Sequence, residues 1–120
     1  MRLLLVVALF LSAHSLAVDD LTPDIGGLVL VQRLYKKQSA FHVCRLFGLE
    51  LAVLREETLP VANNLVTAYC GKNKAVWIAG YNVLDTETAL VFSSGDGDGL
   101  VSDISTPNEH LYVLCASNFE

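Results

Sequence analysis

The stretch Ala75-Val76-Trp77-Ile78-Ala79-Gly80 decides how the rest of the chain is interpreted. It is a short apolar run that contains β-branched residues and the one tryptophan of the chain, and these residue types favour a buried β-strand. We expect Gly80 to end the strand, because a polar turn begins at Tyr81-Asn82. The sequence therefore predicts a central strand in which Trp77 anchors the hydrophobic core.

Two amphipathic helices are expected before this strand. The first begins at Ser39, a favourable N-cap, and ends at the glycine stop Gly48. Its apolar residues recur at a spacing that places them on one helical face: Ala40, Val43, Cys44 and Phe47. The second helix opens at Glu56-Glu57-Thr58 and carries Pro60 in its first turn, where the missing N–H costs nothing. Its expected buried stripe consists of Val61, Leu65, Ala68 and Tyr69.

Short extended segments surround the helices. Residues 28–31 are apolar at successive positions, so we expect this strand to be covered on both faces or paired near the other terminus. Residues 49–54, 89–92 and 111–115 are further expected strands, and the glycine-rich stretch 93–99 is expected to be a flexible loop. Helices followed by short strands predict an α+β fold, with two helices packed on short antiparallel sheets.

The first 17 residues have the composition of an export signal. Arg2 gives a positive start, residues 3–11 are apolar, and Ser15-Leu16-Ala17 is a small-x-small cleavage pattern. The apolar run is too short for a membrane anchor, which needs about 20 such residues. We therefore expect a secreted, extracellular protein without a membrane partner. The expected organisation is a signal peptide (1–17), an irregular segment (18–27), one domain (28–116) and a tail (117–120).

The acidic composition excludes nucleic acid as a partner. Removing a signal that contains Arg2 leaves seven Lys and Arg against thirteen Asp and Glu, a net charge of −6. Nucleic acids are bound by clustered basic residues, and the tight basic pairs here are Lys36-Lys37 and Lys72 with Lys74. His42 and Cys44 are two apart on a helix and point in different directions, which argues against a thiol–imidazole nucleophile. With no other enzyme signature, no enzymatic activity is expected.

Three cysteines belong to the expected domain: Cys44, Cys70 and Cys115. In an oxidising compartment one intramolecular bridge and one remaining thiol are expected, and spacing alone allows three pairings. Cys70 is the best candidate for the remaining thiol, because it lies off the expected stripe and Lys72 and Lys74 should favour its thiolate. It either joins a disulfide-linked homodimer or is buried and inert. No metal-ligand spacing is present, so no metal or cofactor is expected.

Several segments, in order along the chain, resemble those of C-type lectin-like domains. Residues 40–52, AFHVCRLFGLELA, resemble the "A…C…G-x-x-LA" segment of that family. Residues 56–57 lead into a helix like the family's second helix, and residues 76–80 resemble its WIG strand. Residues 89–95 resemble its "F-x-W-x-sG" segment, with Phe92 at the position where the family usually has tryptophan. Residues 112–115 look like its closing strand. The resemblance covers residues 28–116 and implies the family's fold, with Cys44 paired to Cys115.

The chain departs from the calcium-binding members of that family. Those members carry a Glu-Pro-Asn or Gln-Pro-Asp triplet and a Trp-Asn-Asp triplet, whereas this chain has Thr106-Pro107-Asn108-Glu109 and no second tryptophan. Calcium takes 6 to 8 oxygen ligands, so calcium is possible but not expected here. The polar residues that remain as candidate ligand-binding groups are Asn108, Glu109, Asp96, Asp98 and Asp103.

A second alignment to the same family is open. It makes Pro107-Asn108-Glu109 a degenerate remnant of the proline triplet and Cys115 the cysteine that follows it, so that the closing strand would be missing. We favour the compact alignment, because without a closing strand a sheet edge would be exposed and Cys44 would be unpaired.

The resemblance implies a secreted lectin-like binding protein with a glycan or protein ligand. The first hypothesis is carbohydrate binding, with weak or no calcium dependence, at Asn108, Glu109 and the acidic residues between Asp96 and Asp103. The second is a protein-interaction module that has lost sugar binding. A third is a small secreted inhibitor on the same scaffold.

Overall fold

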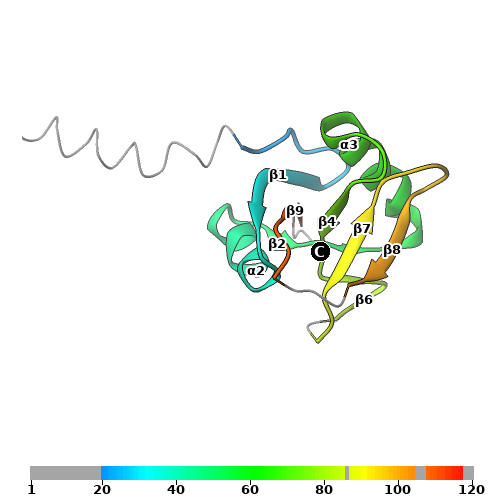
Figure 1. Ribbon diagram of the computed structural model, residues 1–120. Coiled ribbons are helices and arrows are strands. Elements are labelled where there is room, and N and C mark those ends of the chain that lie inside the picture. The colour runs from blue at the N-terminus through cyan, green and yellow to red at the C-terminus, as the bar shows by residue number, and fades with distance from the viewer. Residues whose placement is uncertain (1–19, 86, 105–107, 118–120) are drawn as a thin grey trace, which may run out of the picture.

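The computed structural model has an α+β architecture in which two helices flank a mostly antiparallel sheet (Figure 1), as predicted. It describes residues 20–85, 87–104 and 108–117, so the predicted signal peptide and the last three residues of the tail lie outside the described residues. In chain order the elements are β1 (Leu28–Tyr35), α2 (Lys37–Leu46), β2 (Glu50–Leu51), β3 (Val53–Leu54), the 3-10 helix η1 (Glu56–Thr58), α3 (Leu59–Cys70), β4 (Ala75–Trp77), β5 (Gly80–Tyr81), β6 (Val83–Leu84), β7 (Leu90–Ser93), β8 (Leu100–Asp103) and β9 (Leu111–Ala116).

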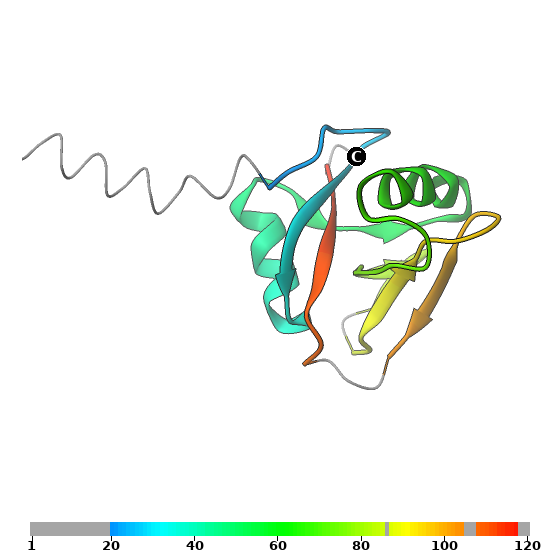
Figure 2. The ribbon, with the colours of Figure 1, turned by 45° about the horizontal axis from the view of Figure 1, so that its top comes forward.

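The main sheet is organised around its last strand. The strand order is β1-β9-β4-β7-β8, and β2 pairs with the end of β9. Strand β9 is antiparallel to β1, which lies beside it in Figure 2, and parallel to β4. A smaller sheet has the order β3-β5-β6, with β3 parallel to β5. The expectation of antiparallel sheets is therefore wrong at two strand pairs.

The two helices cover opposite faces of the main sheet, because successive sheet residues alternate between two hydrophobic clusters. On the α3 side the sheet contributes Leu30, Val76, Phe92 and Leu114. On the α2 side it contributes Val31, Trp77, Val91 and Val113. A sheet that is buried on both faces needs strands that are apolar at successive positions. The sequence prediction for residues 28–31, which lie in β1, is confirmed in both respects, since β1 also pairs with β9.

Trp77 is fully buried in β4, between β9 and β7, so its predicted role as anchor of a central strand is confirmed. Its indole N–H donates to the backbone oxygen of Tyr35 at 2.6 Å, which satisfies the buried polar atom. The run 75–80 is not one strand, because Gly80 begins β5 instead of ending β4. A Cβ at Gly80 would collide with the backbone of Val83, so the β5–β6 hairpin requires glycine there.

A disulfide joins Cys44 of α2 to Cys115 of β9, which confirms the pairing that the family resemblance implied. Both cysteines are fully buried, and 71 residues separate them in sequence. The bond therefore ties the first described helix to the last strand across most of the described chain.

The boundaries of the helices differ from the prediction. Helix α2 begins at Lys37, and Ser39 lies inside its first turn instead of serving as the N-cap. The buried residues of α3 are Ala62, Asn63, Leu65 and Val66, so the predicted stripe is correct at Leu65 and at Val61, which is partly buried against the same cluster, and wrong at Ala68 and Tyr69. Tyr69 is 40% exposed. The apolar residues of α3 cover a wider face than one stripe, and periodicity alone did not indicate that Ala62 and Val66 are buried.

Two strand predictions also change. Residues 49–54 form β2 and β3, which belong to different sheets and meet at Ala52. Strand β8 had no predicted counterpart. Its burial is only partial, so its residues lack a strong apolar signal.

Candidate functional site

The first cavity, which we call the Phe41 groove, lies between the start of α2 and the segment that follows β6. It has a volume of about 530 Å³. Its lining residues come from three parts of the chain: Lys37, Gln38, Phe41, Glu87, Thr88, Ala89, Asp103, Ile104 and Asn108. Two carboxylates, two amides, a hydroxyl and an aromatic ring thus face one concave surface.

Lys37 lines the groove on the α2 side and is 8% exposed. Its ammonium Nζ donates to the backbone oxygen of Ile78 at 2.6 Å. The same Nζ lies 5.5 Å from the ring centroid of Phe41 and 5.6 Å from that of Trp77, within the range of cation–π attraction. Burial lowers the pKa of Lys37, and the nearby carboxylate of Asp85 partly opposes this shift.

A turn begun by Asp85 shapes the opposite wall. The Asp85 carboxylate accepts backbone N–H bonds from Glu87 at 3.0 Å and Thr88 at 3.2 Å, and a hydroxyl bond from Thr88 at 2.9 Å. These bonds, led by the one from Glu87, lower the pKa of Asp85. The wall is also attached to the connection between β4 and β5, because the Asp85 N–H donates to Ala79 O at 2.8 Å. Glu87 and Thr88 are thereby fixed at the rim.

The five predicted ligand-binding residues do not assemble into one site. Asp103 and Asn108 both line the Phe41 groove. Asp96 and Asp98 lie in the β7–β8 loop, at the opposite end of β8 from Asp103. Glu109 lines a different cavity. The expected single polar site therefore divides into three locations: the groove and the β7–β8 loop hold two of the predicted residues each, and Glu109 lies apart from both.

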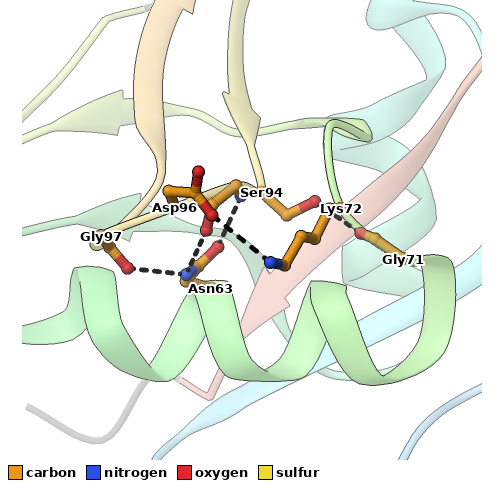
Figure 3. A network of polar contacts seen from close by, with 7 residues as sticks. Asn63, Gly71, Lys72, Ser94, Asp96 and Gly97 are labelled. Carbon is orange, nitrogen blue, oxygen red and sulfur yellow. Dashed lines mark hydrogen bonds and ion pairs between the residues drawn. The ribbon is translucent and has the colours of Figure 1, made fainter.

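The β7–β8 loop is held by Asn63, as Figure 3 shows. The side chain of Asn63 is 9% exposed. Its amide N–H groups donate to Gly95 O and Gly97 O, and its oxygen accepts from Gly95 N–H, each at 3.0 Å. Lys72 pairs with Asp96 at 3.3 Å on the exposed side of the loop. The prediction of a flexible loop is corrected, because a buried amide fixes two of its carbonyl groups.

Ser94 extends this network toward the end of α3. Its hydroxyl donates to Gly71 O at 2.7 Å (Figure 3). The same hydroxyl accepts from the backbone N–H of Lys74 at 3.1 Å. The backbone N–H of Asn73 donates to Ser94 O at 2.9 Å. The hairpin loop is thus attached to both sides of the α3–β4 connection.

Cys70 is unpaired and half-buried at the end of α3. It is partly exposed, as its place off the expected stripe predicted, and it also packs against the hydrophobic cluster that contains Val66. Burial raises the pKa of the Cys70 thiol, and Lys74 only partly offsets this. The expectation that nearby lysines favour the thiolate is therefore corrected, since burial has the larger effect. The thiol lines a second cavity of about 530 Å³, together with Glu109, Leu34 and Tyr112.

Sequence reasoning missed Lys37, Gln38, Glu87 and Thr88 as residues of a site. One signal was available for Lys37. A lysine in the first turn of a helix opposes the positive end of the helix dipole, so its presence there calls for a compensating contact.

The chemistry of the Phe41 groove has to be inferred from its own residues. Within residues 20–85, 87–104 and 108–117, no group of three or more His, Cys, Asp or Glu side chains is arranged to hold a metal ion. In this same part of the chain no helix is long and apolar enough to span a membrane. The chain matches no protein-family model and no curated protein.

Proposed function

We propose that this chain is a secreted, C-type lectin-like binding protein that recognises a glycan in the Phe41 groove without calcium. Three features support the lectin-like assignment. The first helix is disulfide-bonded to the last strand, β1 pairs with β9, and two helices flank the sheet. The family resemblance implied the disulfide and the two helices on the sheet, and the pairing of β1 with β9 agrees with the compact alignment, in which residues 111–116 form the closing strand.

The observation that carries the glycan proposal is the composition of the groove. The amides of Gln38 and Asn108 and the carboxylates of Glu87 and Asp103 surround the half-buried ring of Phe41. A sugar presents hydroxyl groups, which both donate and accept hydrogen bonds, around an apolar C–H face. Amides and carboxylates match the hydroxyl groups, and an aromatic ring matches the C–H face. Small-ligand sites typically combine an apolar surface with a few polar groups that fix orientation.

Independence from calcium follows from the separation of the acidic residues. Asp96 and Asp98 lie at the far end of the β7–β8 hairpin, and Asp96 is already paired with Lys72. The groove retains Glu87 and Asp103 as its acidic lining residues. Since calcium takes 6 to 8 oxygen ligands, two exposed carboxylates are a poor calcium site. A sugar bound here would contact the side chains directly.

The test is a glycan array probed with the disulfide-intact protein, with and without chelator. We expect glycan binding that is unchanged by chelator. Gln38→Ala and Asn108→Ala should each weaken this binding about tenfold, since each removes a hydrogen-bonding amide. The matched control is Asn64→Ala, which removes an exposed amide on α3 away from the groove. Binding that chelator abolishes, or that both groove variants retain in full, would contradict the proposal.

A protein ligand is a second candidate, and β6 favours it. Val83 and Leu84 are 67% and 61% exposed on the edge strand of the β3-β5-β6 sheet. Adjacent exposed apolar side chains on a strand edge are typical of protein-binding surfaces. This candidate predicts that no glycan on the array is bound. It also predicts that the protein binds to an array of extracellular protein domains, and that the Val83→Ser/Leu84→Ser double variant loses this binding. Glycan binding that this double variant leaves intact would contradict it.

A further inference from the structure

Lys37 occupies a position that local energetics disfavour. Its positive charge lies in the first turn of α2, where the helix dipole is also positive, and the exposed lysine Lys36 precedes it. Its side chain is buried, which penalises the charged form. Residues that break local rules in this way are expected where the fold serves a function. The contacts of the Lys37 ammonium therefore indicate the role of its charge.

The contacts of Lys37 end on the segment that carries the opposite wall of the groove. Its ammonium binds the backbone oxygen of Ile78 at 2.6 Å. The N–H of Ile78 donates to Leu90 O at 3.2 Å, and Ala79 O accepts from the N–H of Asp85 at 2.8 Å. Residues 78–79 therefore hold both ends of the segment 85–90. Lys37, which belongs to the α2 wall, is bonded directly to the point from which the other wall is attached.

We propose that Lys37 is the positioning residue of the Phe41 groove, and that its charged ammonium sets the spacing between the α2 wall and the wall formed by residues 87–89. The same ammonium also positions the ring of Phe41 by cation–π attraction, because the ring centroid lies 5.5 Å from Nζ. The inference that this spacing serves a bound glycan rests on the proposed function. The inference that Lys37 sets the spacing does not.

The charge of Lys37 is sensitive to pH in a defined direction. Burial lowers the pKa of Lys37, while the carboxylate of Asp85 opposes the shift. Glu87 and Asp103 line the same cavity, and Lys36 and Tyr35 are its titratable neighbours in sequence. The wall spacing should therefore be present at neutral pH and be lost as the pH rises through the pKa of Lys37, below the usual lysine value of about 10.4.

Stability and positioning should separate in a neutral variant. A lysine whose pKa is lower in the folded than in the unfolded state destabilises the fold when it is protonated. Lys37→Met removes this cost and keeps an unbranched side chain between the rings of Phe41 and Trp77, although Ile78 O loses a partner. We expect the Tm of the variant to stay within about 5 °C of the parent. Glycan affinity should fall about tenfold, because the walls lose their common attachment.

Trp77 provides a direct readout, because it is the one tryptophan of the chain and its ring lies 5.6 Å from Nζ of Lys37. Intrinsic fluorescence is titrated from pH 7 to 11, and carbon-13 methyl spectra follow Thr88 and Ala89 on the opposite wall. We expect the fluorescence and both methyl signals to change with one midpoint. Lys37→Met should abolish this step. Lys36→Met, the control at the exposed neighbour, should retain it.

The outcomes separate the two proposals. Methyl signals of Thr88 and Ala89 that do not move with the Trp77 step, or a step that persists in Lys37→Met, would overturn the role of Lys37. The titration of the unmodified protein decides this even if the variant fails to fold. If the unmodified protein binds no glycan, the proposed function fails, while the spectroscopic result still decides whether Lys37 sets the groove.

Discussion

The hydrogen bonds of Asn63 make the β7–β8 loop a quantitative test of the structure. Asn63→Asp keeps the size and shape of the side chain and the bond accepted from Gly95 N–H. It replaces the amide N–H groups, which donate to Gly95 O and Gly97 O, with a carboxylate oxygen that faces two carbonyl oxygens. The substitution therefore converts two attractive contacts into repulsive ones without opening a cavity.

The expected loss of unfolding free energy is about 3 kcal/mol at pH 7. Two lost hydrogen bonds account for about 2 kcal/mol, and the buried charge adds about 1 kcal/mol more. This is a large part of the roughly 5–15 kcal/mol that stabilises a domain of this size. The carbonyl groups raise the folded pKa of the introduced carboxyl above its unfolded value of about 3.9. The variant is therefore most stable, relative to the parent, below that value, and loses stability as the pH rises through the folded pKa.

Urea unfolding at pH 3.5 and pH 7, followed by the fluorescence of Trp77, measures both effects. The matched control is Asn64→Asp at the neighbouring exposed position, for which we expect a change of less than about 0.5 kcal/mol. The cost at Asn63 should be smaller at pH 3.5 than at pH 7. Equal costs at the two positions, or a cost at Asn63 that does not change with pH, would refute the reasoning.

Three further predictions concern the disulfide, calcium and the remaining thiol. A non-reducing peptide map should recover Cys44 linked to Cys115, and a Cys44–Cys70 link would contradict this pairing. Removing the bond should lower the free energy of unfolding by about 4 kcal/mol, because it closes a loop of 71 residues. Calcium at 1 mM should produce almost no thermal shift, whereas calcium at 100 times its dissociation constant would stabilise by about 2.7 kcal/mol; a shift of several degrees that chelator abolishes would show that the loop aspartates bind it. Because burial raises the pKa of Cys70, its alkylation at pH 7 should be slow until the protein unfolds, and non-reducing electrophoresis should show a monomer; a dimer band that Cys70→Ser removes would instead establish the covalent homodimer.

The sequence predicted those parts of the fold that depend on residue type and periodicity. The apolar run around Trp77 identified the central strand, and residues 28–31 indicated burial on two faces. The buried stripe of α3 was predicted only in part, because apolar residues occupy more than one face of this helix, and the fold buries Ala62 and Val66 where the pattern favoured Ala68 and Tyr69. Hydrophobic periodicity therefore indicates the existence of a helix better than it indicates which face the fold buries, when apolar residues occur on more than one face.

The Phe41 groove could not be predicted in the same way. Its residues come from α2, from the segment after β6 and from the end of β8, and the sequence contains no signal that these three segments meet. The contact between Lys37 and Ile78 spans 41 positions and involves a backbone oxygen, which every residue possesses. A contact to a backbone atom does not depend on the residue type of its partner, so the sequence could not predict this contact. The groove is therefore identified only from the three-dimensional structure.

The position of β9 in the sheet determines when the domain can fold. Strand β9 has β1 on one side and both β4 and β2 on the other, so three earlier segments depend on residues near the end of the described chain. During synthesis, a nascent chain that stops before Leu111 leaves those strand edges unpaired and Cys44 without Cys115. Such edges are prone to aggregate, and pairings between distant segments form slowly. The pairing of β1, β2 and β4 with β9 can therefore form only after the last strand of the described chain has been translated.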